Sequence, residues 1–149
     1  MQDKSLQLVL ELEKKREDQA AMRFTQARQQ CDMQQKRLLG LENYRTEYLN
    51  SALERGKGGL QSMRFGHYHA FIGKLDEGIA QQRIKLQRLE QVVGERQQQW
   101  QEKQQRRKAV EHLLAKKARE LMLKQNRIEQ NNADEYATQG FMRRLRAQR

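Results

Sequence analysis

Two long stretches of the sequence, residues 6–54 and 65–138, contain no proline, and a short glycine cluster separates them. The cluster reads Gly-Lys-Gly-Gly at residues 56–59, and another glycine follows at Gly66. Each glycine costs about 1 kcal/mol in the interior of a helix, so this concentration of glycines predicts a turn. The sequence therefore predicts an all-α fold in which two long helices form an antiparallel coiled-coil hairpin.

The expected organisation is one domain over residues 1–149. The first helix is expected over about 4–54, the turn over about 55–64, the second helix over about 65–138, and a basic tail over 139–149. Ser62 is a candidate N-cap for the second helix, because its hydroxyl can accept a hydrogen bond from a free backbone amide there.

Apolar residues recur every seven positions in the first stretch. Two interleaved series alternate by four and three residues, and five of the seven members of each are apolar. The series are Leu6, Glu13, Ala20, Ala27, Gln34, Leu41 and Tyr48, and Leu10, Glu17, Phe24, Cys31, Leu38, Arg45 and Ala52. This alternation is typical of a coiled-coil seam.

The second stretch has one strong series and one weak series. The strong series runs every seventh residue from Ile72 to Glu135, and eight of its ten members are apolar. The weak series runs from Leu75 to Asn131, and only three of its nine members are apolar. The predicted seam is therefore firm near the turn and loose toward the termini.

An antiparallel register follows from a turn near residue 61. It places Phe24 near Trp100 and Arg45 opposite Glu77, so apolar groups meet apolar groups and opposite charges meet. The first helix is shorter than the second, which is expected to extend past it by about 20 residues, or about 30 Å at 1.5 Å per residue.

Composition agrees with a thin structure. Only 36% of residues are hydrophobic, 33% are charged, and the mean hydropathy is -1.12, which suits a two-helix seam better than a thick core. Disorder competes with this interpretation, but the apolar residues are periodic. No apolar run approaches the roughly 20 residues of a membrane helix. The single cysteine and the lack of a signal-peptide pattern indicate the cytoplasm.

The formal net charge is +11, and most of it lies in the second half of the chain. Residues 1–66 hold 12 Lys/Arg and 9 Asp/Glu, whereas residues 67–149 hold 18 and 10. The last nine residues contain four arginines and no acid. Such a tail is suited to nucleic acid, anionic lipid or an acidic protein surface, although a solvated, frayed helix end explains it equally well.

No residue pattern indicates an enzyme, a cofactor site or a metal site. His67 and His69 lack further ligands at a suitable spacing, and they are expected to face solvent. Cys31 lies on the apolar seam, where a small core residue is the simplest interpretation. The glycine cluster lacks the spacing of a phosphate-binding loop, and no strand precedes it.

Five of the nine aromatic residues are concentrated near the predicted turn. They are Tyr44, Tyr48, Phe65, Tyr68 and Phe71. They are expected either to close the end of the hairpin as a local apolar plug or to form an exposed stripe for protein contact. The stripe comprises Leu41, Tyr44 and Tyr48 beside Phe71 and Leu75.

Several segments resemble the FliJ family of bacterial flagellar export proteins. They are ENYRTEY at 42–48, the glycine-containing turn, YHAFI at 68–72 with Leu75, Trp100 followed by Lys103 and Gln104, NRIEQ at 126–130 and DEYA at 134–137. The resemblance spans nearly the whole chain, and its most specific part is the combination near the hairpin end.

The resemblance implies a cytoplasmic component that associates peripherally with the inner-membrane flagellar type III export apparatus. Proteins of this family are similar to the coiled coil of the gamma subunit of rotary ATP synthases. They act as non-enzymatic stalks that insert into the centre of the hexamer of the export ATPase FliI. They also contact the cytoplasmic domain of the export gate protein FlhA and exchange export chaperones.

The resemblance also suggests contact residues. The gate contact maps onto Leu41, Tyr44, Tyr48, Phe71 and Leu75, and the ATPase contact onto the termini, at Leu6, Leu10, Arg143, Arg144 and Arg146. A nucleic-acid-binding coiled coil and a generic self-associating scaffold remain alternatives. Net positive charge permits nucleic-acid binding, but acidic residues interrupt the basic ones up to residue 135, and no aromatic stacking platform is evident.

Overall fold

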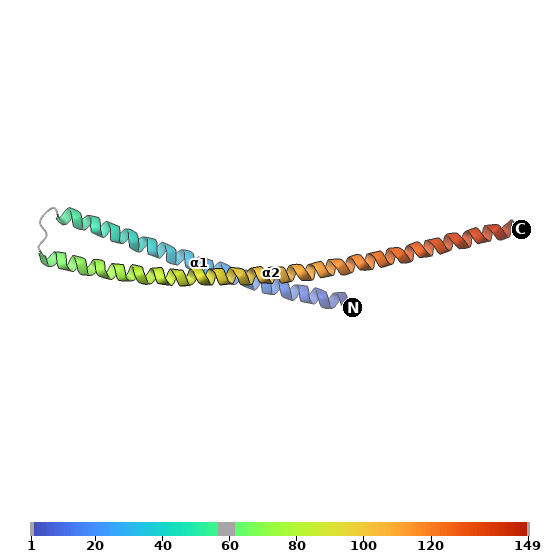
Figure 1. The fold of residues 1–149 in the computed structure, drawn as a ribbon, viewed down its shortest axis with the longest axis horizontal. Helices are drawn as coiled ribbons and strands as arrows, with labels where there is room; N and C mark the ends of the chain where they lie inside the picture. Colours follow the sequence, from blue (N-terminus) through green and yellow to red (C-terminus); the bar gives the residue numbers. More distant parts are fainter. Residues whose placement is uncertain (1, 57–61, 149) are drawn as a thin grey trace. The chain divides into compact units, whose positions relative to one another are not determined.

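Two long α-helices make up the fold in the computed structural model, which describes residues 2–56 and 62–148 (Figure 1). The first helix, α1, spans Gln2–Gly56, and the second, α2, spans Ser62–Ala147. The described residues contain no strand. The predicted all-α antiparallel hairpin is confirmed. Gly58 and Gly59 of the predicted turn lie outside the described residues.

Both helices are longer than expected. The glycine at position 56 is the last residue of α1, and Gly66 lies inside α2. At its other end α2 continues through most of the basic tail, and the Gln148 amide donates a hydrogen bond to the Arg144 carbonyl over 3.2 Å. Leucine, arginine, alanine and glutamine favour helix, and cations near a helix C-terminus stabilise its dipole.

The contacts within the chain divide it into two compact units. Unit 1 comprises residues 1–15 and 104–149, and unit 2 comprises residues 16–103. Each unit therefore contains a segment of α1 and a segment of α2. The single-domain organisation stays a prediction.

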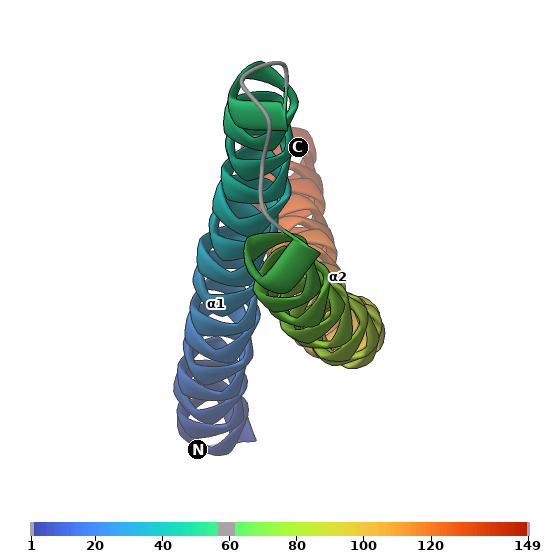
Figure 2. The ribbon, with the colours of Figure 1, turned by 90° about the vertical axis from the view of Figure 1, so that its left-hand side faces the viewer.

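In unit 2 the two helices lie side by side and wind around each other. Their ribbons overlap in the middle of Figure 1, but they are displaced sideways in Figure 2, which views the hairpin from the end where α1 stops and α2 starts. Winding of this kind follows from apolar residues that repeat every seven positions, because the seam must stay on the facing sides.

The predicted heptad positions form the seam of unit 2. The most buried apolar side chains are Ala20, Ala27, Ile79 and Leu86. The most buried apolar positions thus carry alanine on α1 and isoleucine or leucine on α2. Gln34 is also buried, and its side-chain oxygen accepts a hydrogen bond from the Gln82 amide.

The predicted register is confirmed at one position and shifted at another. The rings of Phe24 and Trp100 stack with their centroids 5.6 Å apart. Arg45 pairs with Asp76 over 2.5 Å, so the predicted partner Glu77 is wrong by one residue. Helical side chains lean toward the N-terminus of their own helix, and a rule based on sequence numbers alone does not include this lean.

In unit 1 the seam positions of α2 become exposed toward the C-terminus. Leu6 and Leu10 of α1 are half-buried, as are Val110, Leu114 and Lys117 of α2, whereas every described residue from Ala118 to Gln148 is exposed apart from Gly140. Within this unit α2 runs on past the start of α1 (Figure 1). The predicted loosening of the seam toward the termini therefore ends in a single exposed helix.

Candidate protein-interaction surfaces

An aromatic cluster joins the helices of unit 2 near the end of α1. Tyr48 of α1 lies between Tyr68 and Phe71 of α2, with ring centroids 4.3 Å and 4.6 Å away. Tyr44, one turn earlier on α1, meets Phe71 edge-on at 6.3 Å. These four residues are called the aromatic cluster below. The side chain of Phe65 lies outside the described residues.

Tyr68 of α2 contacts Tyr48 of α1 through both its ring and its hydroxyl group. Its hydroxyl donates a hydrogen bond to the backbone carbonyl of Tyr48, so the ring is held by both stacking and a polar contact. Desolvation between the helices raises the pKa of Tyr68, and the neighbouring Tyr48 raises it further. The sequence predicts Tyr68 as a member of the aromatic group but not as a contact residue, because spacing alone does not show which ring supports another.

The five predicted gate-contact residues differ in exposure. Leu41, Tyr48, Phe71 and Leu75 are half-buried, whereas Tyr44 is 48% exposed. The structure brings the rings of Tyr44, Tyr48 and Phe71 together, and Leu75 follows one turn after Phe71 on α2. The cluster is therefore partly an apolar plug, centred on Tyr48, and partly an exposed edge, formed by Tyr44.

A network of ion pairs lies beside the aromatic cluster. Arg45 pairs with Asp76, and Arg83 pairs with Glu42 over 3.0 Å, so each pair crosses between the helices. Hydrogen bonding to Asp76 raises the pKa of Arg45. Exposed pairs of this kind contribute little to stability, but they favour one register over its neighbours.

The predicted ATPase-contact residues fall into two separate groups in unit 1. Leu6 and Leu10 are half-buried in the seam, beside a groove lined by Gln7, Leu114, Ala118, Leu121 and other α2 residues. Arg143, Arg144 and Arg146 are exposed near the end of α2. About 33 Å of helix separates Leu121 from Arg143, so the two groups do not form one site.

The remaining candidates from the sequence show no catalytic arrangement. Cys31 is half-buried, and burial, with smaller contributions from Glu90 and Asp32, raises the pKa of its thiol. His67 and His69 are exposed. Over the described residues, no three histidine, cysteine or acidic side chains gather in a way that suits a metal ion.

None of the described helical segments combines the length and the apolar character needed to cross a membrane. The grooves in both units are shallow and open, and they lie along the line where α1 and α2 meet. The fold and surfaces define a class of protein: a helical hairpin whose exposed faces are available to partners.

Comparison with known proteins narrows this class to one family. The family described as "Flagellar FliJ protein" matches residues 1–146. Flagellar FliJ proteins of Salmonella typhi and of Escherichia coli (strain K12) are each 30% identical over 140 residues, which cover 94% of this chain and 95% of each relative. The chain belongs to the flagellar FliJ protein family. No solved structure gives a significant match.

Membership confirms the resemblance found in the sequence and supports a role related to flagellar export. The match extends across α1 and nearly all of α2, so both the seam and the exposed end of α2 belong to the shared region.

Proposed function

We propose that this protein is a non-enzymatic stalk and adaptor of the flagellar type III export apparatus. In this role it links the ring of the export ATPase FliI to the cytoplasmic domain of the gate protein FlhA and exchanges export chaperones. Family membership over residues 1–146 is the observation that carries the proposal. The protein would work in the cytoplasm, at the membrane-embedded export apparatus.

The aromatic cluster supports a gate contact in unit 2. A plug needs only enough aromatic surface to fill the seam, and Tyr48 already supplies it through its ring contacts with Tyr68 and Phe71. Tyr44 adds a ring that remains about half exposed, and aromatic residues in such positions are common anchors of protein interfaces. The proposed gate surface is therefore Leu41, Tyr44, Tyr48, Phe71 and Leu75.

The exposed part of α2 supports an ATPase contact in unit 1. Residues 118–148 present large apolar side chains to solvent, among them Leu121, Ile128 and Phe141, together with the exposed arginines at positions 143, 144 and 146. A single helix inside a ring contacts the subunits unequally, which promotes ring assembly and ATP turnover. Leu6 and Leu10 would hold α1 against this helix.

The direct test combines binding and turnover with purified proteins. The full chain is expected to bind FliI and the FlhA cytoplasmic domain in pull-down assays, and to raise the rate of ATP hydrolysis by FliI. A double-stranded DNA oligonucleotide serves as the control for non-specific binding to charge. The salt concentration is varied in the FliI, FlhA and DNA binding assays. Binding to DNA alone, with no effect on ATP hydrolysis, would contradict the proposal and favour the nucleic-acid alternative.

A further inference from the structure

The first turns of α1, in unit 1, are apolar on more sides than the seam requires. Five of the seven residues from Leu6 to Leu12 are leucine or valine. Leu6 and Leu10 are half-buried in the seam, whereas Leu8, Val9 and Leu12 are 66%, 41% and 46% exposed. A coiled-coil seam needs only about two apolar residues in each heptad, so three of the five are available for another contact.

The three exposed residues form a continuous stripe along α1. Val9 and Leu12 are three residues apart, and Leu8 and Leu12 are four apart, and both spacings bring side chains together on the surface of a helix. The stripe begins at Val9, directly beside the seam residue Leu10, and it extends away from α2 to Leu8. A helix that is apolar around most of its circumference is typically covered on those sides.

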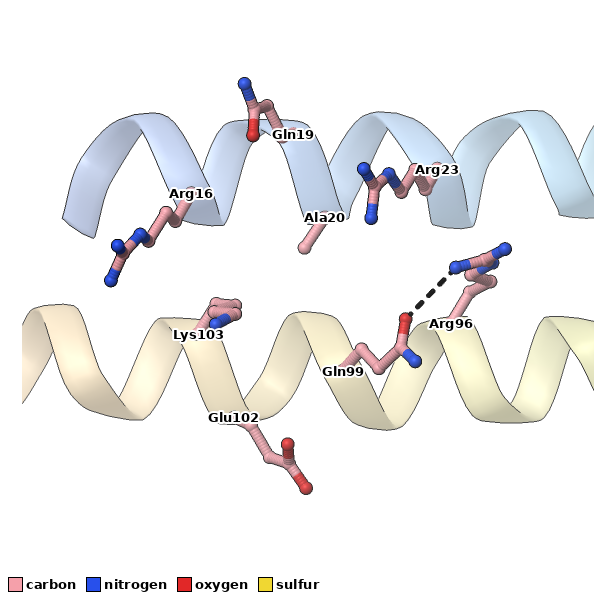
Figure 3. Close-up of a pocket in the computed structure, with 8 residues that line it drawn as sticks. All are labelled: Arg16, Gln19, Ala20, Arg23, Arg96, Gln99, Glu102 and Lys103. Atoms are coloured by element: carbon pink, nitrogen blue, oxygen red, sulfur yellow. Dashed lines mark hydrogen bonds between the residues drawn. The ribbon is translucent and has the colours of Figure 1, made fainter. Parts of the chain in front are cut away.

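Unit 2 shows which residues of two antiparallel helices share one side of the hairpin. Arg23 of α1 and Gln99 of α2 line the same groove (Figure 3). The residues that follow them, Phe24 and Trp100, stack in the seam. Each groove residue thus precedes its seam neighbour by one position, and the opposite directions of the helices turn both side chains to the same side of the seam.

Leu113 of α2 has the corresponding place in unit 1. It directly precedes the seam residue Leu114, as Val9 precedes Leu10, and it is 43% exposed. Gln7 and Leu114 line one groove of this unit, which places Leu113 at nearly the height of Val9. Exposed apolar side chains of both helices therefore lie on one side of the seam. The apolar face, as it is called below, consists of Leu8, Val9, Leu12 and Leu113.

The opposite side of the same segment is polar. The residues beside the seam there are Gln7 and Lys14 of α1, and Gln104 and Glu111 of α2. Glu111 pairs with Arg107 over 2.8 Å. Polar residues on both flanks of the seam are typical of a two-stranded coiled coil. A seam that is widened by apolar residues on one flank is typical of helices that pack against a further helix.

Charge indicates the kind of helix that suits this face. Unit 1 holds 15 Lys/Arg and 8 Asp/Glu residues. The exposed Lys15 and Lys116 each follow a residue of the apolar face by three positions, so they lie at its edge. Arg106 and Glu120 lie on the same side of α2, seven residues before and after Leu113. Three cations and one carboxylate around an apolar surface favour a partner with acidic flanks.

We propose that the apolar face binds an amphipathic α-helix of a partner protein whose apolar stripe is bordered by glutamate or aspartate. The partner helix lies along both helices of unit 1 as the third strand of a short coiled coil. Its apolar residues pack on Val9, Leu12 and Leu113, and its carboxylates accept charge-assisted hydrogen bonds from Lys15 and Lys116. This contact is additional to the proposed gate and ATPase contacts.

Two other occupants suit the face less well. A second copy of the chain would bring the same cations together, and like charges across an interface oppose association. An anionic bilayer attracts cations and apolar side chains, but the apolar face is divided between two helices whose axes are about 8–10 Å apart. A third helix fits between them, whereas a bilayer surface is flat.

The test uses the full chain and fluorescently labelled synthetic helices of about 21 residues, a length that permits helix formation in water. The probe has one stripe of leucines with glutamates along both borders. In one control peptide the leucines are spread around the helix, and in the other lysines replace the glutamates. Fluorescence anisotropy measures the affinities, and both controls are expected to bind at least about tenfold more weakly, a change of about 1.4 kcal/mol.

Matched variants assign the binding to the apolar face. Val9→Gln with Leu113→Gln removes one apolar side chain from each helix, and the affinity for the probe is expected to fall at least about tenfold. Met22→Gln with Ile84→Gln removes two side chains of unit 2 that are 62% and 52% exposed, and the affinity should fall less than about twofold. Circular dichroism checks that both variants remain helical. Leu8→Gln, at a 66% exposed position, tests the face if the first variant unfolds.

Hydrogen exchange locates the bound probe on the full chain. The probe is expected to slow amide exchange in residues 5–15 and 106–116, which contain the apolar face and its cations. Slower exchange confined to residues 122–145 would place the contact on the end of α2 and overturn the proposal.

Further results would also overturn the proposal. They are no saturable binding of the probe, equal affinity for the probe and either control peptide, and equal losses in the two double variants. Sedimentation that shows a dimer dependent on Val9 and Leu113 would make the face a contact between copies, and tighter binding of phosphatidylglycerol vesicles than of the probe would make it a membrane contact. Neither FliI nor FlhA is present in these experiments, so their failure leaves the proposed stalk function to its own test.

Discussion

The two tyrosines of the α1 stripe have different physical roles, although they are the same residue type and lie one turn apart. Tyr48 is half-buried, stacks on Tyr68 and packs against Phe71 at a tilt, whereas Tyr44 touches Phe71 only edge-on and is about half exposed. Stacked, buried aromatic surface contributes to folding, and exposed aromatic surface is available to a partner.

Single alanine substitutions are expected to separate these roles. Tyr48→Ala should lower the free energy of unfolding by roughly 2 kcal/mol, because it removes the close ring contacts with Tyr68 and Phe71 of α2, whereas Tyr44→Ala should lower it by less than about 1 kcal/mol. Tyr44→Ala should nevertheless weaken FlhA binding. Urea denaturation and pull-down give the two readouts, with the 77% exposed Tyr136 changed to alanine as the control. Normal gate binding by the Tyr44 variant would mean that the cluster serves only as a plug.

The Cys31 thiol is expected to react slowly with alkylating reagents. Burial and nearby acidic side chains raise its pKa, so at neutral pH the folded protein holds less of the reactive thiolate than an exposed cysteine does. The midpoint of the iodoacetamide rate against pH should lie above that of a short cysteine peptide, and the difference should vanish in urea. A midpoint at or below the peptide value would show that the thiol is not desolvated.

At the scale of the helices, the most buried positions of the seam carry both small and large residues. In unit 2 they include Ala20 and Ala27 of α1 and, at another height along the seam, Ile79 and Leu86 of α2. The close packing of such layers leaves no volume for additional methylene groups. The alanines are therefore as important to the seam as the larger residues.

Ala27→Leu is expected to destabilise the hairpin, even though it increases apolar content and leucine is itself a good helix former. Overpacking of a filled layer costs typically about 1–3 kcal/mol. Ala80→Leu, at an exposed position beside Ile79, is the matched control and should change the free energy of unfolding by less than about 0.5 kcal/mol. An Ala27 variant that is more stable than the parent would show that this layer contains unfilled space.

The two termini are expected to respond differently to truncation. Residues 139–148 are exposed except for Gly140, so removing residues 139–149 should change the melting temperature by no more than about 2 °C. Removing residues 1–12 deletes the half-buried Leu6 and Leu10 and should lower it by roughly 5 °C.

The same two truncations also test the proposed ATPase contact. Loss of the arginine tail should slow association with FliI, because its cations attract an acidic surface over about 8 Å at physiological salt. Loss of residues 1–12 should reduce the stimulation of ATP hydrolysis more strongly, since it frays the seam of unit 1. If both truncated chains stimulate FliI as the full chain does, the contact lies elsewhere.

At the scale of the whole molecule, the antiparallel arrangement decides which residues meet. Spin labels at Gln30 and Gln91, which are exposed and lie at matching heights on the two helices of unit 2, should give a distance well below that of labels at Gln30 and Glu54. The second pair lies along one helix and is separated by about 36 Å. Pulsed electron paramagnetic resonance measures both distances. A longer distance for the cross-helix pair would rule out this register.

The sequence alone determined the helical class, the heptad positions and the family resemblance. Each depends on local pattern: the absence of proline keeps both helices intact, and every predicted α1 seam residue, from Leu6 to Ala52, is buried or half-buried. The stacking of Phe24 on Trp100 also followed, because large apolar residues at matching heights in the seam must meet.

Tertiary structure decided the contacts and exposures that depend on the direction in which side chains point across the seam. It paired Arg45 with Asp76 instead of Glu77, and it made Tyr48 a packed residue and Tyr44 an exposed one. It also brought Arg16 and Arg23 to face Lys103 and Arg96, which are distant in sequence and share no motif. Heptad spacing assigns a residue to a face of its own helix, but only the packing of the second helix determines which side chains meet there and which remain open to a partner.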